Sequence, residues 1–304
     1  MSGINTNRSN IELPTEVSGE ILQKTQEDSA IMALARRIAL PGRGLTIPVI
    51  TGDPEASWVD ETNAKPISNP GLSKKIMQAY KLAVIVPFSD EFSRDMSSLY
   101  DALVARLPRA LALKFDQTVF GASEKPGSNF DNFASATAQS ISAANTDIYD
   151  ALVAADTDIS VHGGILNGYA LSPQAKGVLL GSRDGDNRPL FINSAAEGAV
   201  PMLLGAPVKY SKAAYVAGTS GSGSVSPAGG ATPDVLGVAG DWTQALYGTV
   251  EGVKIDMSNQ ATLTINNEAV NLWERNMFAV RAEIEVGFRA DVTVFNKITR
   301  THSA

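Results

Sequence analysis

The sequence predicts an α+β fold in which a long helix separates two groups of strands. Strand-forming residues fill 45–51 and 76–86. Apolar side chains then recur at helical spacing from Leu99 to Phe115. Near the C-terminus, residues 278–288 alternate between apolar and mostly charged side chains, which is the period of a strand with one buried face. Strands and helices segregated along the chain in this way are typical of the α+β class.

The first residues of the chain are polar, and we expect them to form an extended arm. From Thr15 onward, apolar residues at helical spacing predict a helix that continues to Ile38. A break near Ser29 is expected, because serine caps helices and can restart one. Pro41 and Gly42 then end the helix.

The next segment predicts a two-stranded ribbon. Its strands, 45–51 and 76–86, flank a polar, proline-marked tip that contains Trp58, Glu61 and Lys65. A ribbon of two strands is marginal in water, because a single neighbour leaves much of its apolar surface uncovered. We therefore expect the ribbon to lie on another surface, and a neighbouring subunit is the natural candidate.

A helical pattern follows the ribbon. Residues 89–96 predict a short helical turn, and a longer helix begins at Ser98, where Asp101 completes a pattern resembling a capping box. This helix is expected to end at Gly121. Pro108 lies in its middle and removes a backbone donor, so we expect a long, bent helix.

The middle of the chain reads as a compact α/β domain. Residues 124–140 are rich in Ser, Ala and Asn and predict a connector. Short elements follow between about 145 and 270, with helices at 147–155 and 173–180, a strand at 168–171, a turn-rich loop at 182–187 and a mobile surface loop at 216–233.

The last part of the chain predicts an antiparallel hairpin. The alternating strand at 278–288 is followed by a turn at Ala290-Asp291 and a second apolar stretch that reaches Ile298. One face of the hairpin is apolar and the other carries charges of both signs. Two interpretations stay open for the charged face: it is solvated, or it contacts another subunit.

Composition excludes several classes of chemistry. The chain has 304 residues, no cysteine and two histidines, so thiolate sites and imidazole-based catalysis have little material. Its net charge of −7 disfavours a protein that grips nucleic-acid phosphates. The stretches 218–223 and 184–187 superficially suggest a phosphate loop and a calcium loop, but both lack the remaining motif residues. His162 and His302 are interpreted as loop and terminal residues, and we predict no catalytic, metal-binding or cofactor-binding residue.

The order of these elements resembles the major capsid protein of tailed bacteriophages, the Hong Kong 97 type of shell protein. The resemblance covers nearly the whole chain, and the stretches that carry it are LPTEVSGEILQKTQEDSAIMALAR, PEASWVDE, KLAVIVPFSDEF, NGYALSPQAKGVLL and NMFAVRAEIEVGFRADVTVFNKI. Each motif is loose, so the order of the elements matters more than any single string.

The resemblance implies a Hong Kong 97-like fold and a structural function. It implies hexamers and pentamers of an icosahedral phage head that encloses double-stranded DNA without reading its sequence. The implied segments are an N-terminal arm and helix at 1–43, an extended E-loop ribbon at 44–87, a peripheral (P) domain with a spine helix at 88–144, an axial (A) domain at 145–270 and a return to the P-domain at 271–304.

The resemblance also implies partners and contacts. The chain is expected to assemble with itself in the cytoplasm of a bacterial host and to reside in the virion, together with a separate scaffolding protein, a portal and a decoration protein. The residues expected at inter-subunit contacts are Trp58, Glu61, Lys65, Lys74, Lys75, Arg281, Glu283 and Arg289. Some members of the family cross-link Lys to Asn, for which Asn296 is a candidate, but non-covalent interlocking is the default expectation.

Three alternatives remain at this stage. An encapsulin-type compartment would share the fold and enclose a cargo enzyme. A carboxylate-dependent hydrolase would need a carboxylate pair with perturbed pKa values, and no motif for one is present. An adhesin or tail component would need fibre repeats or a sandwich-like run of strands, against which the long central helix argues.

Overall fold

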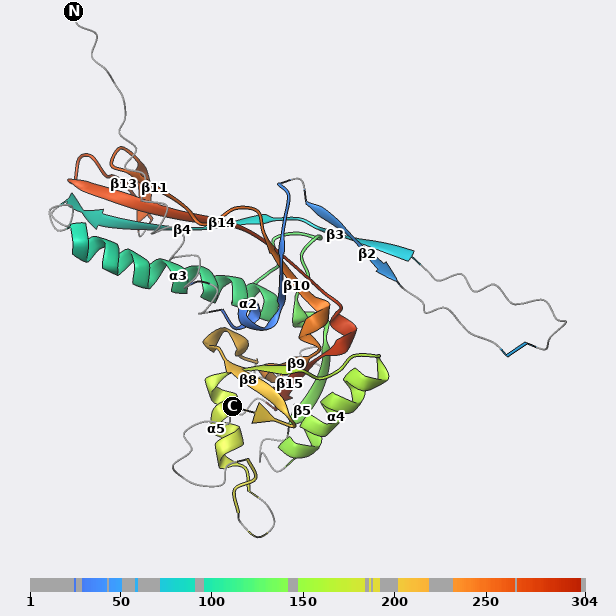
Figure 1. Ribbon diagram of the computed structural model, residues 1–304. Helices are drawn as coiled ribbons and strands as arrows, with labels where there is room; N and C mark the ends of the chain where they lie inside the picture. The colour runs from blue at the N-terminus through green and yellow to red at the C-terminus, as the bar shows by residue number, and fades with distance from the viewer. Residues whose placement is uncertain are drawn as a thin grey trace, which may run out of the picture.

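The computed structural model describes residues 25, 29–42, 44–50, 58–59, 72–90, 96–141, 147–183, 186, 188–191, 202–218, 232–265 and 267–301. Two sheets dominate this part of the chain, and a long helix extends along the first of them (Figure 1). No helix among the described residues is long and apolar enough to span a membrane.

The first sheet has five strands arranged around β14 (Met277–Ala290). Antiparallel partners of β14 are β4 (Tyr80–Ser89) along one edge, and β10 (Ala245–Thr249) and β11 (Lys254–Ser258) along the other. A parallel strand, β1 (Arg36–Ala39), extends the sheet beyond β10. The apolar side chains of β14 point to one face, where Leu107 and Leu111 of helix α3 (Met96–Phe120) share a core with them. The alternation of apolar and charged residues in β14 therefore creates the apolar face on which helix α3 packs.

The second sheet has six strands in the order β5 (Thr137–Ile141), β15 (Phe295–Arg300), β9 (Asp234–Gly240), β6 (Gly168–Leu171), β8 (Ala206–Tyr210) and β7 (Met202–Leu203). Helix α4 (Ile148–Val161) packs on β5 and β15, and α5 (Pro173–Gly181) packs on β9. A cluster of buried rings joins this sheet to the first one, with Phe133 at its centre in contact with Trp242, Phe288 and Phe295.

Smaller elements connect these layers. The ribbon consists of β2 (Leu45–Ile50) and β3 (Leu72–Met77), which pair with each other. A second two-stranded sheet contains β12 (Thr262–Ile265) and β13 (Glu268–Asn271). The remaining short helices are α2 (Ala30–Leu34), η2 (Phe133–Ser135), η3 (Lys212–Ala214), η4 (Trp242–Gln244) and η5 (Val292–Val294).

The long helix is confirmed, but its predicted start is wrong. Helix α3 begins at Met96, so Ser98 lies inside the helix and is not its N-cap residue. The helix continues through Pro108 and ends before Gly121, whose φ of 86° is the left-handed conformation that favours glycine at this position. The predicted turn at 89–96 is not formed at Ser89, because that residue is the last of β4.

The helix predicted to reach Ile38 is also wrong. Helix α2 ends at Leu34, and Ala35 adopts an extended conformation with a ψ of 155°. Residues 36–39 then pair with β10, so their backbone groups are satisfied by a sheet edge that the local sequence does not reveal. Ser29 does cap α2, as predicted, by accepting a hydrogen bond from the Met32 amide. The earlier part of the predicted helix, 15–24, lies outside the described residues.

The predicted C-terminal hairpin is the third correction. Strand β14 forms as expected, but β15 does not pair with it and instead lies between β5 and β9 in the second sheet. The turn η5 redirects the chain, and Phe295 and Ile298 are buried in the core around Phe133. The burial of these side chains in another layer outweighs the local pairing that a hairpin would give.

Several boundaries differ from the sequence-based expectation. The strand predicted over 76–86 is divided at Gln78-Ala79 between β3 and β4, and the predicted connector contains β5. Helix α4 extends beyond Ala155 to Val161, whereas β6 has the predicted bounds. Strands β10 and β11 belong to the first sheet and β15 to the second. Most of the predicted loop at 216–233, and His302, lie outside the described residues.

Candidate assembly surface at the base of the ribbon

The ribbon exposes apolar side chains on both of its faces. Leu45 lies opposite Met77 and Thr46 opposite Ile76, so Leu45 and Ile76 point to opposite sides, and 36% and 49% of their surfaces are exposed. At the tip, Trp58 is fully exposed. Figure 1 shows β2 and β3 extending away from the first sheet. Exposed apolar residues gathered on one projecting element are typical of a surface that meets a partner.

The base of the ribbon is fixed by Arg289 of β14. Its Nε donates to the carbonyl oxygen of Ile76 at 2.8 Å, its Nη1 to Asp131 Oδ1 at 2.7 Å and its Nη2 to Asn129 Oδ1 at 3.1 Å. The guanidinium is largely buried, with 11% of the side chain exposed. Its planar fork therefore holds a ribbon strand and the 128–131 loop in one geometry.

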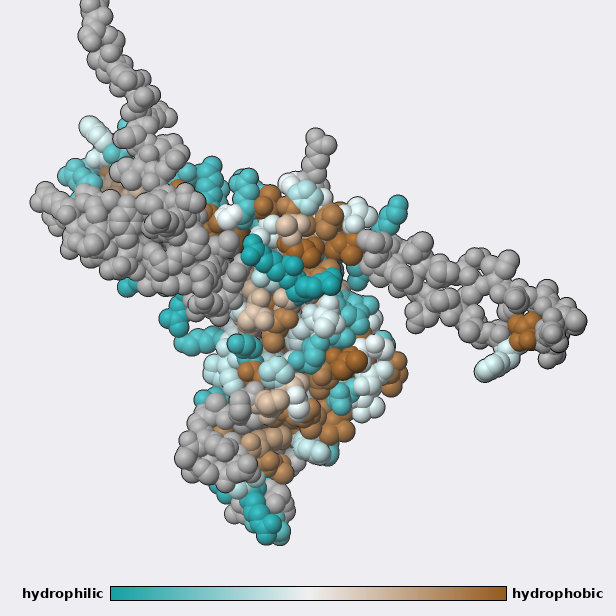
Figure 2. Space-filling view, in the orientation of Figure 1, coloured by the Kyte–Doolittle hydropathy of each residue, from teal (hydrophilic) through white to brown (hydrophobic). Residues whose placement is uncertain are grey.

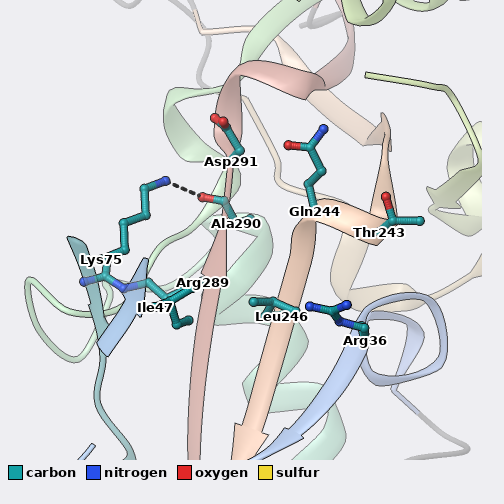
Figure 3. Close-up of a pocket in the computed structure, with 9 residues that line it drawn as sticks. All are labelled: Arg36, Ile47, Lys75, Thr243, Gln244, Leu246, Arg289, Ala290 and Asp291. Atoms are coloured by element: carbon teal, nitrogen blue, oxygen red, sulfur yellow. Dashed lines mark hydrogen bonds between the residues drawn. The ribbon is translucent and has the colours of Figure 1, made fainter. Parts of the chain in front are cut away.

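A second contact closes this network. Lys75 Nζ donates to the carbonyl oxygen of Ala290 at 3.1 Å (Figure 3), and the Ala290 amide donates to Asp131 Oδ2 at 3.3 Å. We call this set the ribbon-base network; it consists of Lys75, Ile76, Asn129, Asp131, Arg289 and Ala290. It joins residues that are more than two hundred positions apart in sequence, and it determines the direction in which the ribbon leaves the sheet.

A cleft of about 200 Å³ lies beside the network (Figure 3). Its lining residues are Arg36, Ile47, Lys75, Thr243, Gln244, Leu246, Arg289, Ala290 and Asp291. The Thr243 hydroxyl donates to Asp241 at 2.6 Å, and Lys75 and Arg289 are engaged in the network. The cleft has cationic side chains on one part of its lining and the apolar Ile47 and Leu246 on another. Its lining includes no histidine or cysteine that could serve as a catalytic base or nucleophile.

The charged face of the first sheet satisfies its charges within the chain. Arg281 Nη2 lies 2.6 Å from Asp256 Oδ2, and its Nε lies 3.1 Å from Glu283 Oε1. The hydrogen bond to Asp256, with the nearby charge of Glu283, raises the pKa of Arg281. Lys81 and Glu285 form a longer pair at 3.5 Å. These exposed pairs follow from the register of β14 with β4 and β11.

The eight predicted contact residues therefore fall in different environments. Trp58 and Lys74 are exposed on the ribbon; Arg281 and Glu283 lie on the charged face; Lys75 and Arg289 hold the ribbon base. Glu61 and Lys65 lie outside the described residues. Asn296, the cross-link candidate, is fully buried, and its Nδ2 donates to Asp158 Oδ2 at 2.9 Å, so it offers no amide at the surface.

Sequence reasoning missed Asp116, a buried carboxylate on α3. It accepts hydrogen bonds from Ser29 Oγ at 2.6 Å, from the Ala30 amide at 2.9 Å and from Ser211 Oγ at 3.3 Å. Burial raises the pKa of Asp116 from 3.8 to about 6, against the lowering effect of these bonds. The residue joins α2, α3 and the turn η3. Its signal in the sequence was an aspartate directly after Phe115, on the apolar side of the helix.

Known proteins match this chain over most of its length. A model of the phage capsid family matches residues 11–296. "Probable major capsid protein gp17" of Mycobacterium phage L5 is 28% identical, over 94% of this chain and 89% of the relative. The "Major capsid protein" of Staphylococcus phage 80alpha is 24% identical, over 94% of this chain and 84% of the relative.

Solved structures share the fold. A chain from Gordonia phage Cozz has a TM-score of 0.70 at 21% identity, with 91% of this chain and 87% of that chain covered. A chain from Mycobacterium phage Cain has a TM-score of 0.68 at 19% identity, with 100% and 96% covered. Because the family model spans almost the whole sequence and the fold agrees over the same range, the chain belongs to the phage capsid family.

Proposed function

We propose that this chain is a major capsid protein that assembles into hexamers and pentamers of an icosahedral phage head around double-stranded DNA. The observation that carries the proposal is the ribbon. Among the described residues, β2 and β3 pair with each other alone, and they expose Leu45 and Ile76 on opposite faces. A neighbouring subunit would cover this surface and so stabilise both copies.

The mechanism in this proposal is geometric rather than catalytic. A rigid body, whose two sheets share a common core around Phe133, carries a ribbon whose direction is set by Arg289 and Lys75. Each subunit reaches one neighbour and is reached by another. Many such weak contacts act together in a closed shell, so the assembly is stable although each interface is modest.

We further propose which segments play which part. The ribbon, β2–β3 with its tip at Trp58, is the E-loop; α3 with the sheet around β14 is the P-domain; and the six-stranded sheet with α4 and α5 is the A-domain. In this assignment Trp58 and Lys74 contact the neighbouring copy, as we also propose for Glu61 and Lys65. Arg289 and Lys75 support that contact from within the subunit.

The proposal places the mature protein in the virion, after assembly in the cytoplasm of a bacterial host. A separate scaffolding protein and a portal are expected partners, and a decoration protein is a further one. The net charge of −7 is consistent with a shell that encloses DNA and does not bind its phosphates tightly.

Electron microscopy of the purified recombinant chain, with size-exclusion chromatography beside it, tests the assembly directly. We expect shells, or rings of five and six subunits. Trp58→Ala should reduce their yield strongly, because Trp58 is fully exposed and contributes little to the folded subunit. Trp273→Ala is the matched control, since Trp273 is also an exposed tryptophan, with 70% of its surface accessible, but lies outside the ribbon.

Two results would contradict the proposal. One is a chain that stays monomeric at every concentration, alone and with the scaffolding protein encoded beside its gene. The other is a Trp58→Ala variant that unfolds, since the ribbon tip would then belong to the core of the subunit. Particles that enclose a cargo protein in place of nuclease-protected DNA would keep the shell fold and replace the phage head with an encapsulin-type compartment.

A further inference from the structure

Helix α4 carries an apolar stripe that faces away from its own sheet. Tyr149, Val153, Thr157 and Val161 are spaced by four residues and share one side of the helix, and 49%, 40% and 76% of Tyr149, Val153 and Val161 are exposed. The stripe continues into the following loop at Ile165. Figure 2 shows hydrophobic residues gathered on the side of the molecule where α4 lies. The opposite side of α4 is the one that enters the core.

The hairpin of β7 and β8 carries a second exposed apolar feature. Met202 and Leu204 are 57% and 43% exposed, and we call these two residues the hairpin tip. Leu204 and Gly205 form its two-residue turn with φ values of 46° and 81°. Turns of this kind favour Asn, Asp or Gly, and leucine at positive φ costs about 1–2 kcal/mol. An exposed leucine in so unfavourable a conformation indicates a role beyond the stability of the subunit.

The segments that carry the two features have opposite charges. Residues 147–165, which include α4, contain Asp147, Asp150, Asp156 and Asp158 and no lysine or arginine. Residues 202–218, which include the hairpin tip, contain Lys209 and Lys212 and no acidic residue. Both lysines are exposed. Contact of the stripe with a second stripe would oppose like charges, whereas contact of the stripe with the hairpin tip brings opposite charges together.

The topology places the two features at opposite ends of one sheet. Helix α4 covers β5 and β15, whereas β7 is the edge strand at the other end of the order β5-β15-β9-β6-β8-β7. Four strand spacings separate β15 from β7, about 20 Å. Two complementary surfaces at opposite ends of one body form a head-to-tail contact, which gives a ring when the rotation between successive copies closes, as it does in a hexamer or a pentamer.

We infer that the α4 stripe of one copy packs against the hairpin tip of the next copy in the hexamer and the pentamer. The inference rests on the proposed function and specifies which surfaces meet between subunits. The ribbon then provides a separate contact, so a subunit has two independent ways of holding its neighbour.

A disulfide experiment tests this pairing, because the chain contains no cysteine of its own. The double variant Val153→Cys with Leu204→Cys should, on oxidation of purified particles, give a ladder of linked chains up to five and six copies on a non-reducing gel. A disulfide within one chain is excluded, because the two Cα atoms would have to approach within about 7 Å. Each single-cysteine variant should remain unlinked, as should the control pair Val153→Cys with Lys125→Cys, since Lys125 is exposed outside both features.

A second variant separates assembly from folding. Leu204→Gly removes the exposed side chain and relieves the unfavourable φ, so the thermal midpoint of the isolated subunit should stay equal or rise. The fraction of protein in particles should fall by about tenfold or more, because each lost contact is repeated around the ring. A residue that mattered only for the local turn would not give this combination.

The results distinguish this inference from the proposed function. If the unmodified chain forms particles and the double-cysteine variant forms them without a ladder, or Leu204→Gly assembles normally, the pairing is refuted while the capsid function stands. If the unmodified chain forms no particles under any condition, including with its scaffolding protein, the proposed function itself fails. A disulfide-linked dimer from a single-cysteine variant would show instead that like surfaces meet.

Discussion

Replacing Arg289 with alanine is the most direct test of the ribbon-base network. The variant loses the bonds to Ile76 and Asn129, each worth about 1 kcal/mol, and an ion pair with Asp131 at 2.7 Å. Asp131 is 21% exposed and would keep only the Ala290 amide as a partner in the network, so losing this pair costs about 1–2 kcal/mol more. We expect the free energy of unfolding to fall by about 3 kcal/mol.

Arg281 provides the matched control for this measurement. It lies on the same face of β14, eight residues earlier, and pairs with two carboxylates, but 45% of its side chain is exposed. Solvent screens such pairs, so Arg281→Ala should cost about 0–1 kcal/mol. Urea unfolding of the isolated subunits measures both values. In hydrogen exchange, Arg289→Ala should also lower the protection of amides in 72–77, whereas Arg281→Ala should not.

The reasoning is refuted if Arg289→Ala destabilises the subunit no more than Arg281→Ala, or if ribbon exchange is unchanged. Burial would then have no influence on how much these ion pairs contribute to the free energy of unfolding. Arg289→Lys adds a further check, because lysine keeps the charge but cannot replace the planar fork. We expect it to recover less than half of the lost stability.

Three other predictions concern separate parts of the chain. Burial raises the pKa of Asp116 to about 6 in the folded protein, so its neutral form is favoured there; this contribution to stability is fully present below pH 3.8 and is lost as the pH rises through 6. Relative to Asp116→Asn, the unmodified subunit should therefore gain about 2 kcal/mol of unfolding free energy between pH 7 and pH 4. The same pH dependence of the unfolding free energy in both proteins, measured by urea titration, would contradict this. Leu107→Ala should lower the free energy of unfolding by about 2–5 kcal/mol, since Leu107 is buried between α3 and β14. Leu113→Ala, on the exposed side of α3, should lower it by less than about 0.5 kcal/mol. Equal shifts of the thermal midpoint would contradict the packing of α3 on β14. Trp58→Ala should leave the thermal midpoint unchanged while particles disappear from micrographs, and a lowered midpoint would argue against an exposed tip.

Local pattern by itself determined several elements of this protein. Strand β14 was predictable because residues 278–288 alternate with the period of a strand. Helix α3 was predictable because apolar residues recur at helical spacing through Phe115 and because Gly121 favours the conformation that ends a helix. The first strand of the ribbon was predictable for the same reason, whereas most of the second predicted strand belongs to β4 of the first sheet. The absence of cysteine leaves no thiolate chemistry, and two histidines leave little material for imidazole-based catalysis.

The tertiary structure alone decided which elements meet. Residues 36–39 look helical, yet they pair with β10 two hundred residues later, and β15 leaves its neighbour β14 for another sheet. Arg289 was predicted from the sequence as an inter-subunit contact, and within the subunit its side chain packs against the 128–131 loop and the ribbon. Partners distant in sequence leave no periodicity in the chain, because the energy of burial and pairing depends on proximity in space. Local spacing therefore determined the elements, whereas long-range burial determined their neighbours.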